Sequence, residues 1–175
     1  GTAHNIALVS IVKRYLGQAN KVAQGLWGAG QMMFNKYLVI TPENVNIRSR
    51  EDMFALLRHF DAERHLIHSE GILDILDHSS PTTGYGSKLA IDLTDIDINT
   101  EPEPLKRPRT AMPAGGVELF NTELFDELGL LILYAEREWQ EKIDVVEYLT
   151  KNNIKARFVA LFDRGAAGSM TVNDL

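Results

Sequence analysis

The stretch NIALVSIVK, Asn5–Lys13, decides the fold that the sequence predicts. It is a nearly continuous run of β-branched and aliphatic residues, which is typical of a strand covered on both faces. The segment from Gly17 to Met33 then carries apolar residues at helical spacing, with glutamine and lysine side chains on the other side. A buried strand that leads into an amphipathic helix predicts the first half of a β-α-β unit and therefore a parallel sheet.

The alternation of strands and helices continues along the chain. Ser49, with Asp52 three residues later, resembles a capping box and predicts the start of a second helix. Further strands are expected at residues 36–41, 65–69, 89–93, 130–135 and 156–162, and further helices at 122–128 and 138–152. This order predicts an α/β fold with a mainly parallel sheet flanked by helices, arranged as a Rossmann-like three-layer domain.

A segment rich in proline and glycine divides the chain. Residues 99–116 contain four prolines and two glycines, which leave little room for regular structure. We therefore interpret residues 1–98 as the core, 99–116 as a proline-rich linker or insertion, and 117–175 as a β-α-β extension of the same sheet. All three are expected to form a single α/β domain, 1–175.

Composition excludes several classes of function. A formal net charge of −6 argues against a nucleic-acid surface, which needs a basic face. The chain has no cysteine, so thiolate catalysis, disulfides and cysteine metal sites are excluded within it. No apolar run approaches the roughly 18 residues that a transmembrane helix requires, and we expect no membrane span.

Three sets of residues suggest chemistry but favour a structural interpretation. The glycines of GLWGAGQM, 25–32, lie late in the expected helix instead of at its start, so a dinucleotide site is disfavoured against close helix packing. His65 and His68 would point to opposite sides of a strand, which disfavours a metal site. Asp77, His78 and Ser79 have the residue types of a hydrolase triad, but neighbours in sequence rarely converge on one point.

The more informative cluster is SIVKRYLGQ, where Lys13, Arg14 and Gln18 lie between the first strand and the first helix. Open α/β sheets place their ligands at this edge. A lysine there could bind a carboxylate or an electron-rich cofactor edge, while a charged strand end exposed to solvent is the alternative. Asp163 and Arg164 follow the last expected strand in the same way, and for them the solvated strand end is favoured.

Three segments together resemble the C-terminal part of the UbiD family of prenylated-flavin-dependent decarboxylases. They are ALVSIVKRYLGQANKVAQGLWGAGQMMFNKYLVI, NVNIRSREDMFALLRHFDAERHLI and ILDHSSPTTGYGSKLAIDLT, whose order and spacing cover Ile6 to Thr94. The type resembled is the 3-octaprenyl-4-hydroxybenzoate carboxy-lyase or menaquinone biosynthesis decarboxylase. Leu16 and Ile75 stand where the family often has proline, which indicates a divergent branch and leaves the substrate open.

The resemblance implies a longer enzyme that removes CO2 without oxidation from aromatic or α,β-unsaturated acids. Its cofactor would be prenylated FMN with a divalent metal and potassium, held mainly by an upstream domain. No catalytic residue and no metal ligand is therefore assigned in this chain, and Lys13 is the one cofactor-binding candidate. By itself the chain is expected to bind no cofactor and to be inactive.

The resemblance also implies partners. They are the upstream flavin-binding domain of the same chain, further copies in a homo-oligomer, and a flavin prenyltransferase that supplies the cofactor. The loop ending in Lys88 and Asp92 is expected to be an ordered connector that presents these two side chains to a neighbouring domain or subunit. A cytoplasmic location is expected, with peripheral membrane association through a lipid-like quinone precursor as an option. The alternative is a non-catalytic oligomerisation domain of a parent with changed activity.

Overall fold

The computed structural model describes residues 5–105, 117–120, 122–135 and 149–163. The chain divides into two compact units, residues 1–101 and residues 102–175. The boundary between them lies inside the proline-rich segment 99–116. The finer division at residues 98 and 117, and the assignment of both units to one domain, remain predictions.

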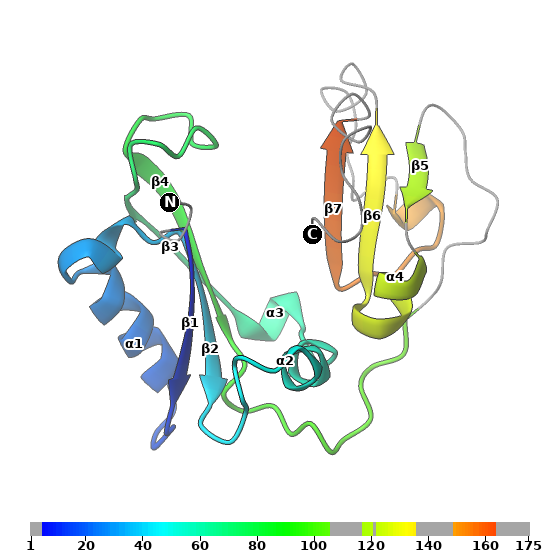
Figure 1. The fold of residues 1–175 in the computed structure, drawn as a ribbon, viewed down its shortest axis with the longest axis horizontal. Coiled ribbons are helices and arrows are strands. Elements are labelled where there is room, and N and C mark those ends of the chain that lie inside the picture. The colour runs from blue at the N-terminus through cyan, green and yellow to red at the C-terminus, as the bar shows by residue number, and fades with distance from the viewer. Residues whose placement is uncertain (1–4, 106–116, 121, 136–148, 164–175) are drawn as a thin grey trace. The chain divides into compact units, whose positions relative to one another are not determined.

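The first unit is built on a four-stranded sheet with the order β1-β2-β4-β3 (Figure 1). Strands β1, β2 and β4 are parallel, and β3 is antiparallel to β4. This confirms the expected mixed α/β fold with a mainly parallel sheet and flanking helices. In chain order the elements are β1 (Ile6–Ile11), α1 (Gln18–Trp27), the 3-10 helix η1 (Gly30–Phe34), β2 (Tyr37–Pro42), α2 (Arg50–Leu57), α3 (Ala62–His65), β3 (Leu66–Ile72) and β4 (Tyr85–Asp92).

Helix α1 packs its small residues against the sheet. Ala19, Ala23 and Trp27 recur every four residues, so they form one stripe on the helix. They are buried together with Leu38, Ile40 and Ala90 of the sheet. The alanines allow the helix backbone to approach the strands closely, and Trp27 continues the buried stripe to the last residue of the helix.

The first helix is shorter than the sequence suggests. It ends at Trp27, and Gly30 has φ +50°, a conformation that interrupts an α-helix and that glycine adopts without strain. Residues 30–34 then continue as η1. Gly25 has no atom within 4 Å of the place where a side chain would begin. Close helix packing is therefore not the reason for that glycine.

Helix α2 begins as its capping residues predict. The Ser49 hydroxyl accepts a hydrogen bond from the Asp52 backbone N–H at 3.1 Å, which satisfies one of the free donors of the first turn. Met53 and Leu56 are buried on one side of the helix. Figure 1 shows α2 and α3 on the side of the sheet opposite to α1.

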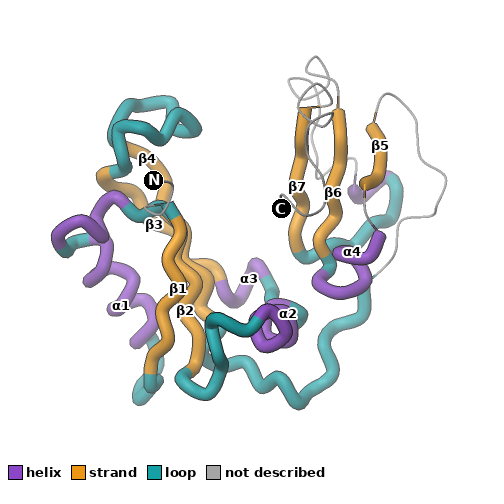
Figure 2. Tube along the Cα trace, viewed as in Figure 1, coloured by secondary structure: helices purple, strands orange, loops and turns teal. Residues whose placement is uncertain are grey.

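The second unit has its own sheet, visible as a separate group of strands in Figure 2. Its elements are β5 (Val117–Phe120), α4 (Thr122–Leu128), β6 (Leu130–Ala135) and β7 (Phe158–Asp163). The strand order is β5-β6-β7, with β5 antiparallel and β7 parallel to β6. The expected helix at 122–128 and strand at 130–135 are confirmed. Most of the expected helix at 138–152 lies outside the described residues.

The expectation that this region extends the first sheet is wrong. Strands β5, β6 and β7 pair with one another, and none pairs with β1–β4. The physical reason is a separate core, formed by Phe125, Leu131, Leu133 and Ile154. Apolar residues of the second unit can therefore be buried without a shared sheet.

Candidate functional site

The carboxyl ends of three parallel strands meet at one edge of the first sheet. Ile11 pairs with Pro42, and Ile40 pairs with Asp92, so β1, β2 and β4 end side by side. Lys13 follows β1, and Thr94 and Asp95 follow β4. The topology therefore brings together residues that are 82 positions apart in sequence. This is the edge at which open α/β sheets place their ligands.

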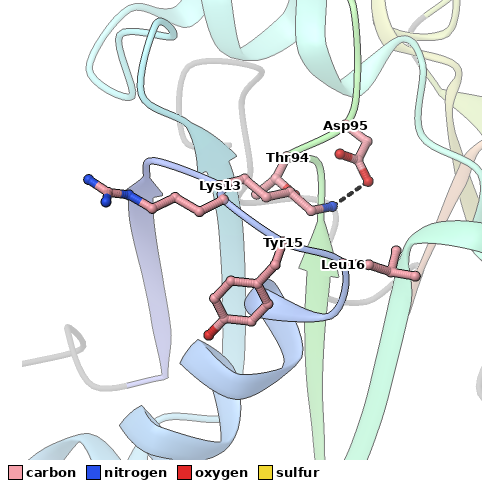
Figure 3. Close-up of a pocket in the computed structure, with 6 residues that line it drawn as sticks. Lys13, Tyr15, Leu16, Thr94 and Asp95 are labelled. Carbon is pink, nitrogen blue, oxygen red and sulfur yellow. Dashed lines mark hydrogen bonds and ion pairs between the residues drawn. The ribbon is translucent and has the colours of Figure 1, made fainter.

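An open pocket of about 400 Å³ lies at this edge, lined by Lys13, Arg14, Tyr15, Leu16, Thr94 and Asp95. Figure 3 shows the Lys13 ammonium and the Asp95 carboxylate pointing toward one another, joined by an ion pair. The side chain of Lys13 is only 14% exposed, whereas that of Asp95 is 69% exposed. The lysine is thus held in place along most of its length, while its partner is free to move in solvent.

A second carboxylate stands near the same lysine. Asp92 Oδ2 lies 4.0 Å from Lys13 Nζ, and its other oxygen accepts hydrogen bonds from the backbone N–H and the hydroxyl of Thr94 at 3.0 and 2.5 Å. These bonds fix Asp92 in position. Within the part of the chain that the structure describes, Asp95 has no such support and its side chain is 69% exposed, so it is the more easily displaced of the two.

Gln18 closes the turn that carries Lys13. Its side-chain oxygen accepts a hydrogen bond from the backbone N–H of Arg14 at 2.6 Å, and its amide donates to the carbonyl of Val12 at 3.3 Å. The two bonds hold the residues on both sides of Lys13. Gly17, with φ +80°, then allows the chain to turn sharply into α1. The structure thus brings Lys13, Arg14 and Gln18 together as predicted.

The loop between β3 and β4 is held by an internal polar network. Asp77 accepts hydrogen bonds from the Ser79 N–H at 2.9 Å, the Ser79 hydroxyl at 2.5 Å and the Lys36 ammonium at 2.8 Å. His78 is exposed. The carboxylate that a triad would need is therefore bound by Lys36 and Ser79, and the structural interpretation of this loop holds for Asp77.

Lys36 is the member of this network that the sequence did not reveal. It is buried at the start of β2, and its ammonium lowers the pKa of the Asp77 carboxyl to about 2, with help from Ser79. A lysine directly before a buried strand was the available signal. Without the fold, nothing connects it to an aspartate 41 residues later.

The position of Lys88 contradicts a second prediction. It was expected to face a neighbouring domain or subunit, but it is only 2% exposed and lies on the sheet face that α1 covers. Its ammonium donates to the carbonyls of Met33 and Asn35 at 2.6 and 2.7 Å and lies 5.8 Å from the centre of the Trp27 ring. Burial lowers the pKa of Lys88. Lys88 and Ala90 are two residues apart in β4, so both side chains point to the face that α1 covers.

The remaining candidates do not assemble into a second site. His65 ends α3, where its Nδ1 accepts a hydrogen bond from the Asp61 N–H at 2.9 Å, and burial lowers its pKa. His68 lies exposed in β3. Within the part of the chain that the structure describes, no group of three or more His, Cys, Asp or Glu side chains could hold a metal ion. Asp163 ends β7, and Arg164 lies outside the described residues.

The fold of the first unit and the geometry of its pocket define a class of protein. The first unit is a mainly parallel α/β domain that presents one ordered lysine beside an open pocket at the carboxyl edge of its strands. The chain belongs to the UbiD family: the family model described as the 3-octaprenyl-4-hydroxybenzoate carboxy-lyase C-terminal domain matches residues 1–93. The resemblance drawn from the sequence motifs is therefore confirmed.

Relatives of much greater length share this region. An uncharacterized protein of Archaeoglobus fulgidus is 41% identical over 96 residues, which are 54% of this chain and 20% of that protein. An uncharacterized protein of Aquifex aeolicus is 38% identical over 131 residues, 74% of this chain and 27% of that protein. The chain thus spans about a quarter or less of the length of these two relatives.

Among solved structures, this chain is similar to parts of two enzymes. The UbiD-class enzyme HmfF from Pelotomaculum thermopropionicum, solved in complex with FMN, is 22% identical, with a TM-score of 0.46 over 83% of this chain and 26% of that chain. Vanillic acid decarboxylase from Sedimentibacter hydroxybenzoicus, in its open form, is 25% identical, with a TM-score of 0.47 over 84% of this chain and 27% of that chain. In the described residues, no helix is long and apolar enough to cross a membrane.

Proposed function

We propose that this chain is the C-terminal part of a longer carboxy-lyase that removes CO2 from an aromatic acid without oxidation. Membership of the UbiD family supports the reaction class. The observation that carries the proposal is the position of Lys13, ordered and mostly buried, at the carboxyl edge of the parallel strands beside an open pocket. The family description, which names an octaprenyl hydroxybenzoate, supports a polyprenyl hydroxybenzoate or naphthoate precursor of ubiquinone or menaquinone as the substrate.

The described residues fit one contact to a flavin cofactor and do not fit the whole cofactor site. Lys13 offers a single ammonium, which suits a phosphate, a carboxylate or an electron-rich ring edge. The described residues offer no set of carboxylate and imidazole ligands for a divalent metal. Prenylated FMN, when bound, supplies the electron sink for loss of CO2. We therefore assign its main binding surface, with the metal and potassium, to the part of the enzyme outside this chain.

The role of this chain's own residues is to bind and orient. Gln18 and Gly17 hold the turn, so Lys13 reaches the pocket with its stem already packed, and little conformational entropy is lost on binding. An anionic group that enters the pocket would replace Asp95 at the ammonium, because Asp95 is exposed and Asp92 is not. In this proposal Lys13 is a binding residue and transfers no proton.

The proposal includes an assembly in which this chain lies beside an upstream flavin-binding domain. That assembly is expected to be a homo-oligomer in the cytoplasm and to receive its cofactor from a flavin prenyltransferase. A lipid-like substrate would account for peripheral contact with a membrane. The Rossmann-like three-layer arrangement of the α/β domain also stays a prediction.

The test compares the longer protein with the 175-residue chain, each co-expressed with a flavin prenyltransferase. We expect the longer protein to retain flavin and release CO2, and the chain alone to do neither. In the longer protein, Lys13→Ala should weaken flavin retention or raise KM at least 10-fold, because one charge-assisted contact is lost. Lys21→Ala, which removes an exposed lysine on α1, is the matched control and should change neither.

Three outcomes would redirect the assignment. Tight flavin binding by the 175-residue chain alone would place the cofactor site here and contradict the division of labour. A longer protein that assembles but holds no flavin would support the alternative, an oligomerisation domain of a parent with changed activity. Affinity of the chain alone for a dinucleotide would support a nucleotide-binding module.

A further inference from the structure

One face of the first sheet exposes an unusual amount of apolar surface. Six large apolar side chains on its four strands are between 38% and 59% exposed: Ile6, Leu8, Tyr37, Leu66, Ile72 and Tyr85. Single exposed apolar residues are normal on a protein surface, but a continuous patch of this kind usually marks an interface. These six residues are called the open face below.

The strand register shows that the six residues share one face. Ile6 is paired with Tyr37, and Ile72 is paired with Tyr85, so each pair points to the same side. Tyr37 is in turn paired with Leu89, which has the same parity in β4 as Tyr85. Leu8 lies two residues after Ile6 in β1, and Leu66 lies six residues before Ile72 in β3, so both point to this side as well. The partly buried Val39, Leu89 and Ile91 lie between them and make the patch continuous.

The opposite face shows what such a sheet requires. There, α1 covers Leu38, Ile40 and Ala90, each of which is 0% exposed. Figure 1 shows α1 lying along that side of the sheet. Parallel sheets occur almost only with both faces covered, because their strands are apolar on both sides. Helices α2 and α3 lie on the same side of the sheet as the open face, but the six residues of the open face remain 38% to 59% exposed.

Charge is scarce on the open face. Apart from the hydroxyls of Tyr37 and Tyr85, the titratable side chains described on this side of the strands are His68 and Glu70, both on the edge strand β3. Glu70 accepts a hydrogen bond from the Tyr85 hydroxyl at 3.4 Å, so the polar group lies at the margin of the patch. An apolar centre with a polar margin is the usual anatomy of a protein interface.

We propose that the open face binds a helical segment of the same longer polypeptide, contributed by the part outside these 175 residues. This inference rests on one element of the proposed function, the longer parent chain, and needs neither flavin nor Lys13. The relatives support that element, since about three quarters or more of each lies outside the matching region. The segment must carry apolar residues at positions i, i+3, i+4 and i+7.

A helix suits this surface better than a second copy of the sheet. Parallel α/β sheets are covered by helices, whereas face-to-face packing of two sheets belongs to antiparallel sandwiches. Four strands spaced by about 4.8 Å span roughly 15 Å, which an α-helix of about 10 to 14 residues covers. The length of α1, 10 residues on the other face, is of this order.

Cysteine labelling in flavin-free protein tests the proposal. The chain has no cysteine, so Ile72→Cys and Tyr85→Cys each introduce one thiol on the open face, on different strands. Gln24→Cys places a matched thiol on the exposed side of α1. Native cysteines elsewhere in the longer protein are replaced by serine. A maleimide should label all three variants readily in the 175-residue chain. In the longer protein it should label the two open-face variants at least 10-fold more slowly and Gln24→Cys unchanged.

A photo-crosslinker attached at Tyr85→Cys then identifies the occupant by mass spectrometry, and crosslinks to a helical segment outside the chain are expected. The proposal is overturned by equal labelling of the open face in the longer protein, or by protection already present in the 175-residue chain. It is also overturned by protection that disappears on dilution, which would mean a second copy. Since no flavin is present, loss of decarboxylation would leave this result unchanged, and the two proposals can fail separately.

Discussion

Three lysines of the first unit, Lys13, Lys36 and Lys88, differ in what surrounds their ammonium groups. Lys13 faces two carboxylates at a solvent edge, and Lys36 faces Asp77 inside a loop. The Lys88 ammonium donates to backbone carbonyls and lies near an aromatic ring. The carbonyls of Met33 and Asn35 come from the end of η1, where the helix itself supplies no donors. Lys88 therefore completes that helix end, and Lys13 is the one of the three that an external anion can reach.

The Asp77 carboxylate makes stability depend on pH in a predictable direction. Its folded pKa, about 2, is lower than its ordinary value of 3.8, chiefly because Lys36 donates to it. The stabilisation is therefore fully present above pH 4 and is lost as the pH falls toward 2. The shift corresponds to roughly 2–3 kcal/mol at most. We expect about 1 kcal/mol, because the neighbouring loop residues His78 and Ser79 are exposed and water there screens part of the interaction.

Urea unfolding of the native protein and of Asp77→Asn, measured between pH 2 and pH 6, checks this expectation. Across the lower half of that range, the free energy of unfolding should fall by about 1 kcal/mol more for the native protein than for the variant. Asparagine can still accept the hydrogen bond from the Ser79 N–H, so the loop should keep its shape. If the free energy of unfolding changed with pH in the same way for both proteins, the Lys36–Asp77 pair would contribute nothing to the pH dependence.

At the scale of elements, the turn into β4 depends on Gly86. A methyl group there would lie 2.2 Å from the Ser80 hydroxyl oxygen and 3.0 Å from a methyl carbon of Leu73. Ser80 would have to rotate and lose its hydrogen bond to the Tyr85 carbonyl. We expect Gly86→Ala to lower the free energy of unfolding by about 1–3 kcal/mol through overpacking.

The chain offers a matched control for this change. Gly25 lies in the interior of α1 with no atom within 4 Å of the added carbon, so Gly25→Ala should raise the free energy of unfolding by about 0.5–1 kcal/mol. Chemical denaturation of both variants measures the two effects. Adding Ser80→Gly to the Gly86→Ala variant should restore part of the lost free energy of unfolding, because it removes the side chain that the added methyl group meets. A neutral Gly86→Ala would show that the loop relaxes freely.

At the scale of the whole molecule, the two units have separate sheets and separate apolar cores. A sheet with a core of its own can fold without the other. We predict that a chain ending at residue 101 folds and unfolds cooperatively, as circular dichroism and urea titration would show. A truncated chain without a sigmoidal transition would mean that the first unit depends on residues 102–175.

Much of the local structure was determined by the sequence itself. The apolar run in β1 and the cap at Ser49 are local signals, and the structure confirms the elements they predict. The cluster of Lys13, Arg14 and Gln18 is local in the same way, because these residues are near neighbours in sequence, whereas cofactor binding by Lys13 stays a prediction. The motifs identified the family for the same reason, because they preserve residue type and spacing.

Only the tertiary structure decided which distant residues meet and which side of a strand faces the core. Asp95 became the partner of Lys13 because β1 and β4 end at one edge. Lys88 points inward because a strand alternates its side chains, and the pairing of Leu38 in β2 with Ala90 in β4 puts this set of β4 residues on the face that α1 covers. The second sheet stayed separate because its residues bury one another. Each of these outcomes depends on strand pairing between segments far apart in the chain, which residue type and local spacing do not encode.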